Sequence, residues 1–315
     1  MYLICHNNLK IPQCTTNPPP ASFQPMDADT AAPRLLRRWA WACLLLLVLV
    51  TGLSAFLRHS AEGLGCQPWP ACHAMGAAPT GAAQMVARAT HRVAATAVLL
   101  LAIGGLFLAL RARRRREAAL YALLLLLAVL LAWLGIHTAG SRVPAVALGN
   151  LLGGFLMLAT AARLIGPPAG RGLGAAAAGA ALLLVLQIGS GVLVSASHAG
   201  LACEDLRSCA EQARAAGWPW QALKPWVGAG LLPGDGALLQ WLHRAGAWGA
   251  ALGTLALGAL ALRRGRRADG LLMLGLLASQ WVLGLVLGSA GLPLLAVLLH
   301  NLGSALLLAL VVRSI

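Results

Sequence analysis

Long apolar runs separated by short polar segments dominate this chain, a pattern typical of a protein that crosses a membrane many times. A run of about 20 apolar residues can cross a hydrocarbon core roughly 30 Å thick. We therefore predict an all-α integral membrane protein with eight transmembrane helices. The predicted spans are residues 39–57, 86–110, 118–137, 144–163, 175–196, 238–262, 270–288 and 293–312.

The composition agrees with this pattern, because 59% of the 315 residues are hydrophobic and only 10% are charged. A soluble domain of this length would need far more polar surface. The net charge of +15 could indicate a nucleic-acid partner, but the arginines lie at the N-terminus, in every second loop and at the C-terminus. This alternation is a topology signal. We therefore expect no nucleic-acid partner. We place both termini on the cytoplasmic (or matrix) side of an inner membrane, whose lipid surrounds the spans.

Residues 1–33 differ from the rest of the chain. The three prolines at 18–20 resist helix formation, and no apolar core of a signal peptide lies in this segment. We expect a disordered cytoplasmic tail, with Met26 as an alternative start. The rest of the chain divides into an N-terminal half, 34–166, and a C-terminal half, 167–315.

One pattern occurs twice: two cysteines six residues apart in an outer loop, followed by a His-Arg pair that opens an apolar run. The repetition predicts two four-helix repeats with pseudo-twofold symmetry. The two copies are Cys66 and Cys72 with His91-Arg92, and Cys203 and Cys209 with His243-Arg244.

The cysteine loops are predicted to face an oxidising compartment, so each pair can form a disulfide. We predict two local bridges, Cys66–Cys72 and Cys203–Cys209, each of which rigidifies the rim of a pocket. A role in relaying electrons is the alternative for both pairs.

The helices that carry His243 and His300 are predicted to start on the same side of the membrane, which places the two histidines at the same depth. Polar residues at such depth normally face the interior of a helix bundle. Two imidazoles that converge there can ligate a heme iron from both faces, although a hydrogen bond to a neighbouring helix is the alternative. In the first half the corresponding positions are His91 and Asn150, which are 59 residues apart, against 57 for the second pair.

The arginines that follow the two histidines are candidate partners of a heme. Arg92 and Arg244 are predicted near the outer surface, where propionates would emerge, and a guanidinium binds a carboxylate bidentately. Snorkelling to the interface is the alternative for each. Trp218, Trp220 and Trp226, in the loop 197–237, are either interface anchors or part of a lid.

At these residues the chain resembles heme A synthase. The motifs are Gly63-Leu64-Gly65-Cys66 through Cys72, Ala199-Gly200-Leu201-Ala202-Cys203, Gln240-Trp241-Leu242-His243-Arg244, and Gly291-Leu292-Pro293-Leu294 leading into His300-Asn301. The resemblance covers residues 39–312 in order.

The resemblance implies an enzyme that oxidises the C8 methyl of heme O to a formyl group, giving heme A for cytochrome oxidase. It implies a heme b held by His243 and His300, and a first half that binds the substrate heme. Its implied partners are heme O, heme A, heme O synthase and cytochrome oxidase subunits, and a homo-oligomer is left open.

The first half departs from the family pattern. Arg88 stands where many members have glutamate, and Asn150 where many have histidine, so His91 and Asn150 cannot form a bis-histidine site. His137 either replaces the missing ligand or caps its helix. His91 is the histidine there that matches the family motif, and it is our candidate catalytic residue.

Three further functions are left open. A quinone-linked membrane thiol oxidoreductase would also carry external cysteine pairs on a helical bundle. A non-catalytic, heme-binding oxidase assembly factor is suggested by Arg88 and Asn150. A transporter is compatible with the repeat alone, although broken-helix signatures are not seen in the sequence.

Overall fold

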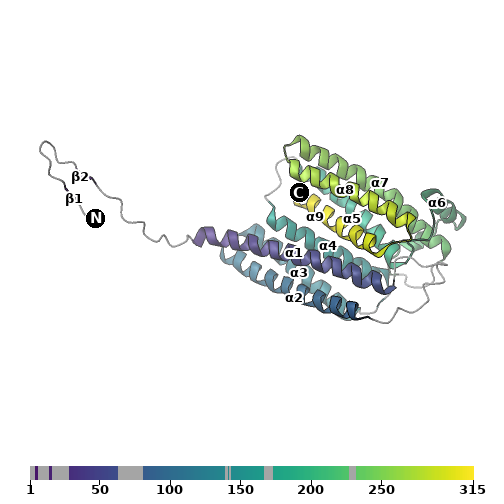
Figure 1. Cartoon of the computed structure of the whole chain (residues 1–315), viewed down its shortest axis with the longest axis horizontal. Coiled ribbons are helices and arrows are strands. Elements are labelled where there is room, and N and C mark those ends of the chain that lie inside the picture. The colour runs from purple at the N-terminus through teal and green to yellow at the C-terminus, as the bar shows by residue number, and fades with distance from the viewer. Residues whose placement is uncertain are drawn as a thin grey trace.

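The computed structural model in Figure 1 describes residues 4–5, 14–15, 28–62, 81–138, 141, 143–166, 173–226 and 232–315. The predicted bridge between Cys66 and Cys72 lies outside these residues. The described residues form helices, apart from a short antiparallel pair of strands, β1 (Ile4–Cys5) and β2 (Cys14–Thr15). The helices are α1 (Ala28–Glu62), α2 (Ala82–Arg111), α3 (Arg115–His137), α4 (Pro144–Ile165), α5 (Gly174–Ala196), α6 (Leu206–Ala215), the 3-10 helix η2 (Trp220–Leu223), α7 (Pro233–Arg263), α8 (Arg267–Ser289) and α9 (Leu294–Arg313).

The prediction of eight membrane spans is confirmed. In the described part of the chain, eight helices are long and apolar enough to cross a membrane, namely all the α-helices except α6. The spans carry many large apolar side chains that are exposed, including Leu100, Leu130 and Leu285, as expected of a surface that faces lipid.

Two helices begin at least five residues earlier than predicted. The expected tail reached residue 33, but α1 starts at Ala28, because the alanines around Pro33 favour a helix. Helix α7 starts at Pro233 rather than at 238. There Pro233 occupies the first helical position, and the carboxylate of Asp235 accepts a hydrogen bond from the backbone N–H of Leu232 (2.8 Å), which stabilises the extra turn.

The helices pack as two four-helix groups. Helices α1–α4 contact one another in a closed order (α1–α2–α3–α4–α1), and α5, α7, α8 and α9 do the same. Contacts between the groups come from α4 with α9, α1 with α9, and α4 with α5. Figure 1 shows α4, α5 and α9 between α1–α3 on one side and α7 and α8 on the other. This contact order is what a twofold axis would produce, although the symmetry itself stays a prediction.

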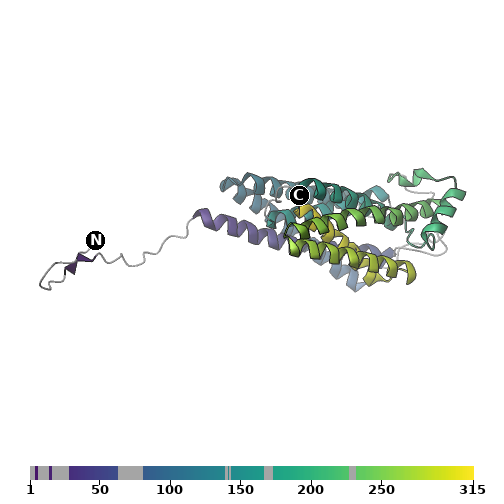
Figure 2. The same cartoon turned by 90° about the horizontal axis from the view of Figure 1, so that it is seen from above.

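The two ends of the bundle differ. The start of α1 and the end of α9 lie toward one end, and α6 lies at the opposite end in both views (Figures 1 and 2). At the first end, arginine side chains donate hydrogen bonds to backbone carbonyls. Arg116 donates to the carbonyl of Arg163 (3.3 Å), and Arg163 donates to that of Arg313 (3.2 Å). The first bond joins α3 to α4 within one group, and the second joins α4 to α9 across the boundary between the two groups.

Tyr121 joins three helices of the first group. It lies on α3, is fully buried, and its hydroxyl donates to the carbonyl of Leu36 on α1 (2.9 Å). Its ring lies against Gly105 of α2, where a Cβ atom would overlap the ring atoms. Glycine is therefore required at 105 because of this close approach.

We expect Gly105→Ala to destabilise the protein by about 1–3 kcal/mol, because the added methyl forces Tyr121 out of its place. Thermal unfolding in detergent measures the effect. Gly179→Ala is the matched control, because a Cβ atom at that helical position meets nothing within 4 Å. Equal melting temperatures for the two variants would contradict this packing of Tyr121 against α2.

Candidate functional site

A cavity of about 720 Å³ opens among α5, α7, α8 and α9, and we call it the second-half cavity. Both histidines predicted to form a pair, His243 on α7 and His300 on α9, line it. Its walls are mostly apolar and include Trp248 and Trp281, whose rings meet edge to face with centroids 4.6 Å apart. Arg244 also lines the cavity. The volume falls in the range of small-molecule and cofactor sites.

Helix α5 places two polar side-chain atoms beside one nitrogen of the His243 ring. The Nδ1 atom of His243 lies 3.1 Å from Ser190 Oγ and 3.1 Å from Gln187 Nε2. Gln187 Nε2 also donates to the backbone carbonyl of His243 (2.9 Å). Gly191 completes this contact, because a Cβ atom there would lie only 2.8 Å from His243 Cε1. The glycine therefore lets the ring approach α5 closely.

The surroundings of His300 leave polar atoms free. Ser304 Oγ lies 2.8 Å from both the backbone carbonyl of His300 and Gln280 Oε1, and can donate to either. His300 Nδ1 and Gln280 Nε2 are buried without a hydrogen-bond partner, and Gln187 Oε1 is in the same state. Such atoms are costly in an apolar interior, and three of them belong to residues that line the cavity, which makes it a candidate ligand site.

His300 is also linked to the first group of helices. The next residue, Asn301, places its side-chain nitrogen 3.4 Å from Nε2 of His59, a buried residue near the end of α1. The wall of the second-half cavity therefore connects through α9 to α1.

These residues fit a heme. The described residues contain no group of three or more His, Cys, Asp or Glu side chains placed to hold a metal ion. A heme needs only two axial ligands from the protein, because the macrocycle supplies the other four, and two imidazoles are a common axial set. His243 and His300 could supply that pair.

Residues 197–226, which we call the lid, cover the N-terminal end of α7. The predicted disulfide between Cys203 and Cys209 is present, with Cα atoms 5.2 Å apart. Both cysteines are buried and pack against Ala237 and Leu238 of α7. Trp218 joins this small core, with its ring centroid 5.2 Å from that of Trp241.

The other two lid tryptophans lie differently. Trp220 stacks on Trp218 with centroids 6.0 Å apart, and both Trp220 and Trp226 are exposed. None of the three lines the second-half cavity. From the sequence, the tryptophans were expected to be either interface anchors or part of a lid. Trp218 is part of the lid.

Helix α6 starts at a capped end within the lid. The backbone N–H of Ser208 donates to the carboxylate of Asp205 (2.7 Å), which lowers the pKa of Asp205 below its usual range. Because the pKa of the folded state is depressed, this cap stabilises the helix above the unfolded pKa. The contribution is lost as the pH falls through the folded value.

Arg244, which follows His243 on α7, connects the lid to this helix. Its guanidinium donates to the backbone carbonyls of Glu204 (2.8 Å) and Cys203 (3.3 Å). The residue that follows His243 therefore holds the disulfide loop over the cavity. A role toward a heme propionate stays a prediction, and the present bonds occupy part of the guanidinium.

The candidate residues of the first half lie apart from this site. His91 is the tenth residue of α2 and is half-buried, whereas Arg92 beside it is exposed. Asn150 is the seventh residue of α4, as His300 is of α9, and it is exposed. His137 ends α3 and packs on Trp133, with ring centroids 4.9 Å apart. None of the four predicted first-half residues lines the second-half cavity.

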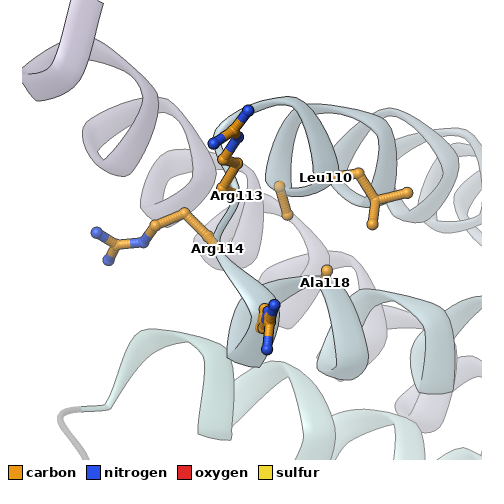
Figure 3. A pocket seen from close by; sticks show the side chains of 6 residues that line it. Leu110, Arg113, Arg114 and Ala118 are labelled. Atoms are coloured by element: carbon orange, nitrogen blue, oxygen red, sulfur yellow. The ribbon is translucent and has the colours of Figure 1, made fainter.

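A smaller hollow of about 390 Å³ lies at the turn between α2 and α3 (Figure 3). Its lining is Ala109, Leu110, Arg113, Arg114, Arg115 and Ala118. Figure 3 shows the Arg113 and Arg114 side chains pointing in different directions, and Arg114 pairs with Glu117 (2.8 Å). The arginines there do not converge on one point, which favours a topology signal over a binding site.

The residues that surround the histidines were not predicted from the sequence. Gln187 and Ser190 are three residues apart in an otherwise apolar span, and Gly191 follows. Polar residues at this spacing share one face of a helix, which is the signal that could have identified them. Ser304, four residues after His300 on α9, could have been found in the same way.

Comparison with known proteins adds one match. The model of a family described as cytochrome oxidase assembly protein matches residues 90–312. It therefore begins just before His91 and includes His243 and His300. No curated protein matches the chain significantly.

We expect Arg244→Gln to loosen the lid, because the two carbonyls lose a charged donor worth about 1.5–3 kcal/mol. Amide hydrogen exchange at residues 199–209 should speed up by roughly tenfold to a hundredfold. Arg207→Gln is the control, because Arg207 is exposed and pairs only with Glu211 on the same helix. Unchanged exchange in the Arg244 variant would show that other contacts hold the lid.

Proposed function

We propose that this chain, which belongs to the cytochrome oxidase assembly family of heme A synthases matched by its residues 90–312, converts heme O to heme A. Membership gives it a role in cytochrome oxidase assembly. The finer assignment is that it oxidises the C8 methyl of heme O to a formyl group, and that it is an oxidoreductase.

The second-half cavity is the observation that carries the proposal. Two histidines from α7 and α9 line one apolar cavity within a bundle, in a chain of a family that handles heme. A heme b bound there would supply the one-electron and oxygen chemistry that side chains lack. We assign His243 and His300 as the residues that would hold it.

The surrounding residues would position this cofactor. Trp248, Trp281 and the leucines of the wall supply apolar contacts, and the disulfide lid, held by Arg244, keeps water from the outer rim. Exclusion of water strengthens every electrostatic interaction in the site. Arg244 is also the group nearest to His243 in sequence that could meet a propionate.

The first half would bind the substrate. We assign His91 to hold heme O, with Arg92 toward its propionates and the opposite side left to Asn150, His137 or water. A heme with a single protein ligand keeps a position open for oxygen species, whereas a bis-histidine heme does not.

A second candidate function is a non-catalytic heme-binding assembly factor. The exposed Arg88 and Asn150 favour it, because they replace an acid and a potential ligand in the first half. The thiol oxidoreductase interpretation is less supported, because Cys203 and Cys209 are buried in the lid core and cannot meet a partner thiol there.

We place the protein in an inner membrane, with the arginine-rich end of the bundle in the cytoplasm and the lid on the outer face. The concentration of arginines at the turns after α2 and α7 supports this orientation. Heme O synthase and oxidase subunits are the proposed partners.

The direct test is to express the chain in a host that makes heme O but not heme A. The extracted hemes are then identified by chromatography and mass spectrometry. Heme A supports the proposal, whereas bound heme b without any heme A supports the assembly-factor interpretation.

The b-type site gives a sharper prediction. His243→Ala and His300→Ala should each abolish the low-spin b-type absorption of the purified protein, because each removes one of two axial ligands. His91→Ala is the control and should retain the spectrum. If both single variants keep a bis-histidine spectrum, the assignment of this pair is wrong.

The proposed substrate site gives a second prediction about heme. His91→Ala should abolish heme A formation and leave the b-type spectrum intact, whereas Asn150→Ala should only lower the rate, because asparagine is a poor iron ligand. Heme A formation is measured by extraction from membranes of matched protein content. Persistent heme A in His91→Ala would rule out the role proposed for this histidine.

A further inference from the structure

We propose that Ser190 is a positioning residue that fixes the tautomer of His243, so that its Nε2 atom carries the free lone pair and faces the second-half cavity. The inference rests on the proposed function, in which His243 ligates a heme iron. It assigns a role to a residue of α5 that holds no metal itself.

The single hydrogen of the Ser190 hydroxyl is already used within α5. Ser190 Oγ lies 2.8 Å from the backbone carbonyl of Gln187, three residues earlier on the same helix, and donates to it. The hydroxyl then has no hydrogen left for His243, and its lone pairs remain. Since Oγ is 3.1 Å from Nδ1 of His243, the bond between them requires a hydrogen on Nδ1.

The side-chain amide of Gln187 is a competing donor. Gln187 Nε2 also lies 3.1 Å from Nδ1 and would favour the opposite tautomer, with hydrogen on Nε2. One of the two hydrogens of this amide donates to the backbone carbonyl of His243 at 2.9 Å, and the second could meet Nδ1. In the proposed function the iron occupies Nε2, so the hydrogen of the ring is on Nδ1. Of Ser190 Oγ and Gln187 Nε2, only Oγ can then accept this hydrogen.

The orientation of the His243 ring agrees with this tautomer. A Cβ atom at Gly191 would be 2.8 Å from Cε1 and 3.3 Å from Nδ1, but 3.6 Å from Nε2. The edge formed by Cε1 and Nδ1 therefore lies against α5, and Nε2 is the nitrogen farther from that helix. Ser190 acts on one nitrogen and leaves the other for the cavity.

A histidine that donates from its second nitrogen is a stronger metal ligand, because the acceptor increases the basicity of the ring. Loss of the acceptor should weaken heme binding about tenfold to a hundredfold. It should also raise the midpoint potential of the b-type heme, because a less basic ligand stabilises the ferric state less.

The test uses a graded series at this position in the full-length, heme-loaded protein. Ser190→Thr keeps the hydroxyl, Ser190→Cys has a weaker acceptor, and Ser190→Ala has none. The midpoint potential should rise in the order wild type and Thr, then Cys, then Ala. Ser279→Ala is the matched control, because Ser279 donates to its own i−3 carbonyl (2.7 Å) on α8 in the same manner, with no histidine contact. It should leave the potential unchanged.

A structural effect of the hydroxyl would not give this order. The proposal is overturned if Ser190→Ala keeps the wild-type potential, or if Ser279→Ala shifts it equally. It is likewise overturned if the Thr variant behaves as the Ala variant does.

Heme-free protein gives a readout that does not depend on the proposed function. In protein labelled with ¹⁵N-histidine and produced without heme, one imidazole should show hydrogen on Nδ1, and that signal should disappear in His243→Ala. In Ser190→Ala it should change to the Nε2–H form, which Gln187 favours. An Nε2–H signal for His243 in the wild type would refute the inference, whatever hemes the protein binds. Failure of the wild type to make heme A would instead count against the proposed function alone.

Discussion

The absence of water from the interior of a membrane is the constraint on which this structure depends, because each polar atom there must find a partner within the protein. Tyr121 does so by bonding to a carbonyl of α1, and Ser190 by bonding to its own helix. In the described part of the chain, ten residues carry a buried side-chain polar atom without a partner, and four of them line the second-half cavity: Gln187, Ser195, Gln280 and His300. The second-half cavity is therefore one of the regions where the helices leave polar atoms unpaired.

The lid provides hydrogen-bond partners for polar groups at one end of the bundle. Arg244 joins it to the histidine helix, and its far end reaches the first group of helices, where the N–H of Ala145 donates to the carbonyl of Pro225 (2.7 Å). Ala145 lies in the first turn of α4, the helix that carries Asn150. A free N–H of a helix start is satisfied by the lid of the other half. One segment, whose own core contains a disulfide, therefore contacts both four-helix groups at the same end of the bundle.

Hydropathy predicted the eight spans because uninterrupted runs of about 20 apolar residues are rare outside membrane-spanning helices. It did not predict where helices begin, since the early start of α7 depends on one carboxylate, that of Asp235. The histidines His243 and His300 were found because the chain repeats their spacing, and the structure brings them to one cavity. Gln187 and Ser190 were missed because neither is repeated in the other half and both lie in a long, largely apolar run. Their role depends on how α5 packs on α7, which spacing along one helix does not encode.

The difference between the halves has a chemical logic. Asn150 and His300 occupy the same position in their helices, so the first half has one potential iron ligand fewer than the second. A cofactor that stays in place benefits from two strong ligands, because slow dissociation keeps it bound. A substrate heme must leave once it has become product, and a second strong ligand would slow that release. Asparagine at 150 therefore suits a pocket that exchanges its heme, and the paired histidines suit a pocket that keeps it. The contact of Asn301, next to His300, with His59 of α1 joins the proposed heme b site to the half proposed to bind the substrate.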